Sequence, residues 1–406
     1  MHQIHLWREE AVEADGSTTV SITIEHPDQT RTPLWFRVPC QYGSLITPSC
    51  DPFVVATLLM AMSQSTDLVV HGEVSPLLLR NLTEFQAAWS SWRPNLYKPI
   101  EIRAEVEREQ FNAEAEEKAI AAFSGGVDSC FTAWRHRTNR CGRLQRNLQA
   151  GLVVHGFDIP LEKQQAFDRA TEKARAILAN LGVELIPMAT NIRELSLNWE
   201  DVFGTAAASC LMLLQRGYST GLIASSFPYQ ALSFPYGSNP VTDWLLSSQA
   251  FQIVHDGADF TRIEKIRELA NWSEAQQNLR VCWEGTQPDK NCGRCEKCVR
   301  TILIFRIFGV GLPPCFEEDV SERQILELKA KEGPLTELER VLDAAKAADV
   351  SESWVSALEK SIARNKRLET REERKAALKK RIPVPVLKGV RKVRSLLPKP
   401  FLFPKS

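Results

Sequence analysis

The stretch Ser124-Gly125-Gly126-Val127-Asp128-Ser129 combines the residue types that hold a phosphate group. It follows a short apolar run over 119–123 and precedes a run over 130–137 whose composition favours a helix. Two adjacent glycines let the backbone turn sharply and present several N–H groups to an anion beside the positive end of a helix. The spacing therefore predicts a pyrophosphate-binding loop, to which Ser124 and Ser129 add hydroxyl donors.

Asp128 repels phosphate directly, so we expect it to hold the loop through backbone hydrogen bonds or to help bind a Mg²⁺ ion that bridges the phosphates. The chain contains no Gly-Lys-Ser/Thr ending of a Walker loop. Cleavage between the α and β phosphates of ATP therefore fits the loop better than transfer of the terminal phosphoryl group. A serine-glycine turn without a ligand is the alternative interpretation.

A second motif lies downstream, where four cysteines follow the pattern Cys-x9-Cys-x2-Cys-x2-Cys at Cys282, Cys292, Cys295 and Cys298. Four thiolates suit one tetrahedral Zn²⁺ and leave no coordination position for water, so the spacing predicts a structural zinc site. A disulfide pair, a redox Cys-x-x-Cys motif and an iron–sulfur cluster are the alternatives.

The glycine loop resembles that of the PP-loop ATP pyrophosphatases, which adenylate a carbonyl or carboxylate oxygen and then displace AMP with a nitrogen or sulfur nucleophile. With the cysteine pattern and Arg300 added, residues 117–310 resemble the 7-cyano-7-deazaguanine synthase family, which converts a carboxylated deazaguanine into a nitrile with ammonia and ATP. The segment Thr261-Arg262-Ile263-Glu264-Lys265-Ile266 stands where that family has a basic segment. The family's aromatic-Gly-Gln-x-His pattern is replaced here by Gly156-Phe157-Asp158-Ile159-Pro160, so the resemblance leaves the acceptor open.

The resemblance implies an ATP-dependent C–N ligase that uses ATP, Mg²⁺ and Zn²⁺. Arg262 and Lys265 can share a helix face and stabilise negative charge on departing AMP or pyrophosphate, although a salt-bridged surface helix also explains them. Asp158 follows the second strand, where it would orient a ribose or a metal-bound substrate. The expected catalytic residues are Asp128, Ser129, Arg262 and Lys265. The expected nucleotide-binding residues are Ser124, Gly125, Gly126, Val127, Asp128, Ser129 and Asp158.

Three functions are compatible with these motifs. The first is a ligase whose acceptor is a 7-deazaguanine acid, a related small molecule or a protein partner; a protein acceptor is suggested because the extra segments resemble those of deazaguanine-synthase-like proteins in anti-phage systems. The second is an RNA-modifying PP-loop sulfurtransferase. The third is a non-catalytic nucleotide-binding protein that assembles a complex.

The elements around the loop predict an α/β fold with a parallel-sheet nucleotide-binding core of the HUP/PP-loop type. Strand candidates lie near 119–123, 152–155, 184–188 and 220–224, separated by helical segments. Ligands of such sheets bind at the carboxyl ends of the strands, so we expect the loops after these strands to face one crevice. Other polar candidates there are His155, Asn191, Arg193, Ser225, Ser226, the segment 236–240 and Asp243.

The domain organisation predicted from the pattern has four parts. Residues 1–112 form an N-terminal α+β domain, with strands at 19–24 and 34–38 and helix starts at Asp51-Pro52 and Ser75-Pro76. The PP-loop domain with its four-Cys knuckle occupies 117–310, a helical region 311–382, and a Pro-rich basic tail 383–406.

Composition sets wider limits on the 406-residue chain, which is 44% hydrophobic and carries a formal net charge of +0. It has no apolar run of about twenty residues and no secretory pattern near Met1, so we expect no membrane span and a cytoplasmic location. Lys and Arg far outnumber Glu in residues 362–406, which would attract nucleic acid or an acidic protein, or would simply be solvated. The sequence gives no indication of the oligomeric state.

Overall fold

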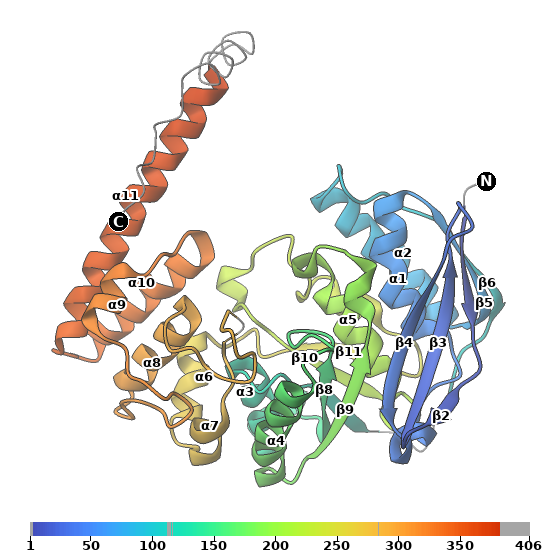
Figure 1. The fold of residues 1–406 in the computed structure, drawn as a ribbon, viewed down its shortest axis with the longest axis horizontal. Coiled ribbons are helices and arrows are strands. Elements are labelled where there is room, and N and C mark those ends of the chain that lie inside the picture. The colour runs from blue at the N-terminus through green and yellow to red at the C-terminus, as the bar shows by residue number, and fades with distance from the viewer. Residues whose placement is uncertain (1–2, 112–114, 116, 283, 382–406) are drawn as a thin grey trace, which may run out of the picture. The chain divides into compact units, whose positions relative to one another are not determined.

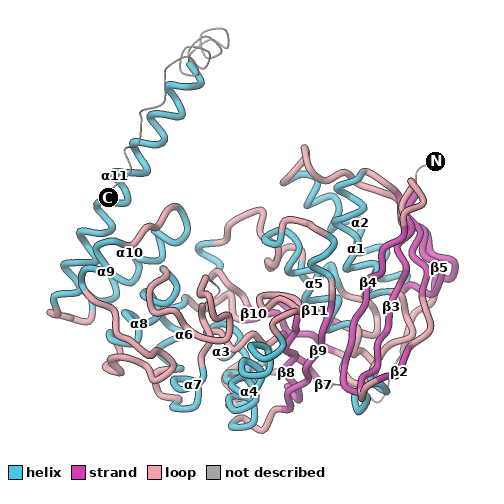
Figure 2. Tube along the Cα trace, in the orientation of Figure 1, coloured by secondary structure: helices cyan, strands magenta, loops and turns pink. Residues whose placement is uncertain are grey.

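The computed structural model describes residues 3–111, 115, 117–282 and 284–381 (Figure 1). Contacts between residues divide the chain into two compact units, Met1–Asp319 and Val320–Ser406. The first unit is α/β and is built on one large mixed, mostly parallel sheet, and the second is helical in its described part (Figure 2). This architecture confirms the α/β class and is compatible with a nucleotide-binding core.

One half of the sheet is parallel throughout. Its strands are β7 (Lys118–Ala122), β8 (Asn147–His155), β9 (Glu184–Thr190), β10 (Thr220–Ala224) and β11 (Gln252–Asp256), in the order β11-β10-β7-β8-β9. The four strands predicted from the sequence are confirmed. The sequence analysis missed β11, because a strand that contains Gln252, His255 and Asp256 lacks an apolar run.

Three helices pack beside these strands: α3 (Val127–Arg137), α4 (Gln164–Asn180) and α5 (Trp199–Met212). On α4 the buried side chains Phe167, Ala170, Ala174, Ile177 and Leu178 recur at helical spacing, as expected of an amphipathic helix against a sheet. The chain leaves α4 through Gly182, whose φ of +65° suits a residue without a side chain.

Residues 3–107 form the other half of the sheet and two helices. The strands are β1 (Gln3–Arg8), β2 (Val12–Ala14), β3 (Ser17–Glu25), β4 (Arg31–Pro39), β5 (Asp67–Val74) and β6 (Ile102–Glu107). The helices are α1 (Asp51–Gln64) and α2 (Pro76–Trp92), with proline in each first turn. The strands predicted at 19–24 and 34–38 and both helix starts are confirmed.

The two halves of the sheet join at one antiparallel contact, in which Phe36 of β4 pairs with Thr190 of β9. The side chain of Asn191 extends the junction, because it accepts from the Trp35 amide at 2.9 Å and donates to the Pro33 carbonyl at 2.9 Å. The sheet order is therefore continuous across the division predicted between 1–112 and 117–310, as β11-β10-β7-β8-β9-β4-β3-β1-β5-β6 with β2 beside β3. Both ranges belong to one compact unit.

The remaining helices of the first unit are α6 (Arg262–Leu269), α7 (Ser273–Asn278) and α8 (Glu296–Ile307). Short 3-10 turns occur at η1 (Cys40–Leu45), η3 (Gly142–Leu144), η4 (Ile192–Leu195), η5 (Tyr229–Ala231) and η6 (Asp243–Leu246). The second unit contains α9 (Glu322–Glu327), α10 (Glu332–Ala347) and α11 (Ser353–Arg381). Among the described residues, no helix combines the length and the apolar character that crossing a bilayer requires. The predicted tail 383–406 lies outside the described residues, so the partner expected for 362–406 stays a prediction.

Candidate functional site

The glycine loop connects the end of β7 to the start of α3. Gly125 has a φ of +75°, which favours glycine, and Gly126 is the residue just before the helix. Inside the loop the Ser129 hydroxyl donates to the Gly126 carbonyl at 3.1 Å, and the Ser124 and Ser129 hydroxyl oxygens lie 3.4 Å apart. The first amide groups of α3 have no partners within the helix and carry its partial positive charge. The local geometry is that of an anion-binding bend.

The loop opens into a cavity of about 230 Å³ at the carboxyl ends of β7, β8 and β10. Ser124, Asp128 and Ser129 line this cavity, and Asp158 reaches it from the loop after β8. Val127, in contrast, is 1% exposed and packs in the core. The structure thus brings the loop and Asp158 together at one crevice, as the position of these residues at strand ends predicts.

Asp128 holds two cations of α6. Its carboxylate accepts from Arg262 Nη2 at 2.7 Å and from Lys265 Nζ at 3.0 Å. Burial alone raises the pKa of Asp128, but the positive charges of Arg262 and Lys265 outweigh it and hold that pKa below its usual value. These hydrogen bonds of Asp128 are with side chains of α6 and not with the loop backbone.

Helix α6 is fixed so that both cations face the loop. Its start has a capping box, in which the Thr261 hydroxyl accepts from the Glu264 amide and the Glu264 carboxylate accepts from the Thr261 amide. Lys265 also donates to the Ser225 carbonyl at 2.6 Å. Arg262 and Lys265 do share one helix face, and that face points at Asp128.

Two further cations, Arg280 and Lys297, lie beside the loop, and the sequence analysis assigned neither of them to nucleotide binding. The Arg280 amide donates to the Gly125 carbonyl at 2.8 Å, and its guanidinium lies 3.3 Å from both the Ser124 carbonyl and the Asp158 carboxylate. Lys297 lies close enough to Asp128 and Asp158 for their charges to act on it. Burial, reinforced by neighbouring arginine charges, nevertheless lowers the pKa of Lys297.

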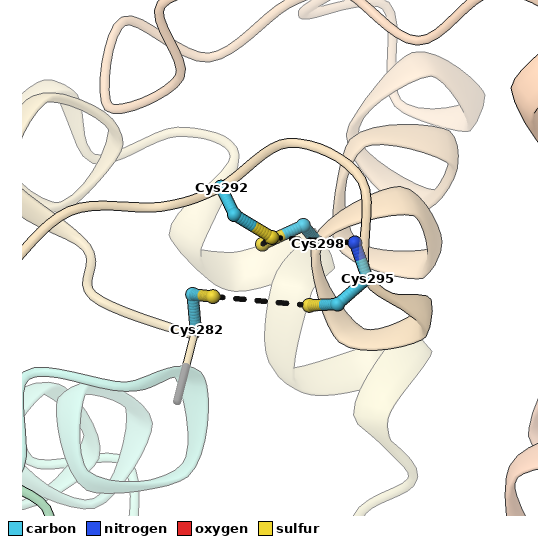
Figure 3. Close-up of side chains that lie close together, drawn as sticks. All are labelled: Cys282, Cys292, Cys295 and Cys298. Carbon is cyan, nitrogen blue, oxygen red and sulfur yellow. Dashed lines mark hydrogen bonds between the residues drawn. The ribbon is translucent and has the colours of Figure 1, made fainter. Parts of the chain in front are cut away.

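The four predicted cysteines lie together, and their sulfur atoms are all within 4.8 Å of one another (Figure 3). Cys282 and Cys295 sulfurs are 3.9 Å apart, as are those of Cys292 and Cys298. Zn–S bonds of about 2.3 Å at tetrahedral angles place sulfurs about 3.8 Å apart, so this donor set fits one zinc ion. All four thiols are free of disulfides. The amide of Cys295 donates to the Cys292 sulfur at 3.3 Å, which favours a thiolate.

The cysteine cluster also explains how the two extra cations are positioned. Cys282 follows Arg280 by two residues, and Lys297 stands between Cys295 and Cys298 at the start of α8. A metal ion held by these sulfurs would therefore also hold the segments that carry both cations. This link escaped the sequence analysis because adjacency of the cluster to the loop is a tertiary property.

Aromatic side chains, among them Phe157, Trp199 and Phe203, also line the cavity. Phe157 meets Trp199 at 5.0 Å between ring centroids, and Phe203 meets Tyr236 at 5.0 Å. Gly204 and Gly237 allow close packing there, since a Cβ added at Gly204 would lie 2.0 Å from the Gly237 carbonyl oxygen. This wall suits a planar ring of the nucleotide or of the acceptor.

Residues that follow α2 hold the start of α5, the helix that carries Trp199 and Phe203. Asp201 in the first turn of α5 accepts from Arg93 at 2.9 Å and from the Tyr97 hydroxyl at 3.0 Å. His155 and Asn191, both candidates for ligand contact, are instead structural: His155 stacks on Phe167 and bonds the Pro160 carbonyl, and Asn191 bonds β4. Burial lowers the pKa of His155, as expected of a packed neutral ring.

Comparison with known proteins adds no further assignment: no family model, no curated protein and no solved structure matches this chain significantly.

Proposed function

We propose that this chain is an ATP-dependent C–N ligase that adenylates a carboxylate or amide oxygen, releases pyrophosphate and then displaces AMP with an amine. The observation that supports it best is the glycine loop at the start of α3, which opens into the crevice beside Arg262, Lys265 and Arg280. Amide groups and cations placed at one point suit an anion whose charge grows as a bond to phosphorus breaks.

The residues of the loop have separable roles in this proposal. Ser124, Ser129 and the loop amides bind the pyrophosphate half of ATP, and Asp128 orients Arg262 and Lys265 toward it. Asp158 and Asp128 are the cavity carboxylates that would hold Mg²⁺, which neutralises phosphate charge when bound. The zinc held by the four cysteines has no open position and acts only by fixing Arg280 and Lys297.

The acceptor we propose is a 7-deazaguanine acid or a related acceptor, including a group on a protein partner. The aromatic wall formed by Phe157, Trp199 and Phe203 supports a planar ring as part of the bound material. An RNA-modifying sulfurtransferase is less well supported, because no cysteine lines the cavity within the described part of the chain. The nearest thiol in sequence, Cys130, is 0% exposed, and burial raises its pKa strongly.

The proposal is tested by incubating the full chain with ATP, Mg²⁺, ammonia and candidate deazapurine acids, and by separating the nucleotides formed. We expect AMP and pyrophosphate in equal amounts, and at least a 100-fold loss of both in Asp128→Asn, following the usual effect of removing one electrostatic group at an active site. Asp259→Asn, a carboxylate 52% exposed, is the matched control. ADP and phosphate as products would exclude adenylation. Binding of ATP without turnover would favour the non-catalytic assembly protein.

A further inference from the structure

Three buried side chains from separate elements align beside the proposed site. Ser225 follows β10, His255 lies on β11, and Asp243 begins η6. The His255 ring nitrogens lie 2.8 Å from the Ser225 hydroxyl through Nε2 and 2.8 Å from the Asp243 carboxylate through Nδ1. Ser225 and Asp243 are each 0% exposed, and the His255 side chain is 6% exposed. The sequence analysis named Ser225 and Asp243 as polar candidates for the crevice but gave His255 no role.

The neighbours of this line hold each of its members in place. The Ser225 hydroxyl oxygen is also 2.7 Å from the Phe227 carbonyl oxygen, to which it donates. The Asp243 oxygen that faces Nδ1 of His255 also accepts from the Ser238 hydroxyl at 2.6 Å. His255 therefore links two side chains that are themselves bonded to neighbouring segments.

The charged groups around His255 are few in the described structure. Asp243 is the ionisable group in contact with the ring. Lys265 is separated from the ring by Ser225, whose carbonyl accepts from Lys265. Asp256 is next on β11, but its carboxylate is bonded to Thr132 and His136. The strand alternation places it on the opposite face.

We propose that His255 is a positioning residue that links Asp243 to Ser225 and so holds Ser225 where its carbonyl receives Lys265. Through Lys265 it sets the ion pair with Asp128. Its role in catalysis rests on the function proposed above, whereas its contacts with Asp243 and Ser225 do not. Asp243 also ties the segment 236–243 to the strand ends, because its second oxygen accepts from the Asn239 backbone amide at 3.0 Å.

The positioning role is tested on the full chain without ATP, by measuring the rate at which an amine-reactive ester acylates Lys265. In Asp243→Asn this rate should rise several-fold relative to Lys290, whose side chain is 46% exposed and serves as the internal reference. An unchanged rate overturns the positioning role. With turnover present, Asp243→Asn should raise KM for ATP more than it lowers kcat. Absence of turnover in the wild type would count against the proposed function alone, because the acylation rate still decides this inference.

Discussion

Replacing Asp128 should destabilise the first unit more than replacing an ordinary surface carboxylate. The side chains of this ion pair are mostly buried: Asp128 is 20% exposed, Arg262 14% and Lys265 3%. The Arg262–Asp128 contact of 2.7 Å and the Lys265–Asp128 contact of 3.0 Å are therefore treated as buried ion pairs. Removing one partner of such a pair costs about 3–5 kcal/mol, because the charges left behind are buried without compensation. Asn keeps one accepting oxygen, so Asp128→Asn should lower the free energy of unfolding by about 3 kcal/mol and Asp128→Ala by about 5 kcal/mol.

The measurement is urea unfolding of wild type, Asp128→Asn and Asp128→Ala, followed by near-ultraviolet circular dichroism. The matched control is Asp259→Asn, whose partner Arg135 keeps a second carboxylate at 3.6 Å, so the cost should be under about 1 kcal/mol. Because the pKa of Asp128 is lowered in the fold, its contribution is present above pH 3.8 and disappears as the pH falls through the folded value. If Asp128→Ala matched the control, the claim that this ion pair is buried and organised would be wrong.

The remaining predictions concern the metal, the cavity wall and a buried histidine. Metal analysis should find one zinc per chain in wild type and in the nearby control Cys315→Ser but none in Cys282→Ser, and zinc retained in Cys282→Ser would contradict the assigned ligands. Gly204→Ala should lower the free energy of unfolding by about 1–3 kcal/mol through overpacking, whereas the control Gly333→Ala, with open space at its Cβ, should leave it unchanged. Equal urea midpoints for the two variants would exclude close packing at Gly204. Burial alone would lower the pKa of His136, but its bonded carboxylate raises it to about 9. Protonated His136 therefore stabilises the fold fully below pH 6.5, and this stabilisation is lost as the pH rises through about 9. The decline in Tm over this pH window should vanish in His136→Gln. A decline that persists in this variant would refute the assignment to His136.

Features that are local in sequence were predictable, and features that depend on packing were not. The glycine pair and the cysteine spacing each specify their geometry within a few residues, so the loop and the donor set could be placed in advance. The strands β7 to β10 were recognisable from apolar runs bounded by turns. Asn191 was misread because a polar residue after a strand can serve a ligand or a neighbouring strand equally well, and only the pairing of β4 with β9 decides between them.

The cations show most clearly what the sequence leaves out. Arg280 carries no motif of its own, and its place beside Gly125 follows from the path of the chain toward the cysteine cluster. Lys297 lies inside the cysteine motif, where a charge near thiolates is the simplest interpretation of it. Its relation to Asp128 and Asp158 arises only because α8 packs near the loop. Such long-range placement has no periodicity that a sequence pattern could reveal.

The charges beside the loop are compatible with the proposed binding of pyrophosphate. Arg262, Lys265, Arg280 and Lys297 lie near the carboxylates of Asp128 and Asp158, and the buried Glu296 also acts on Arg262 and Lys297. Burial is the largest cause that lowers the pKa of Lys297, and the positive charges of Arg262 and Arg300 add to it. In the proposed function, a pyrophosphate group at the loop amides brings negative charge close to these cations and raises that pKa again.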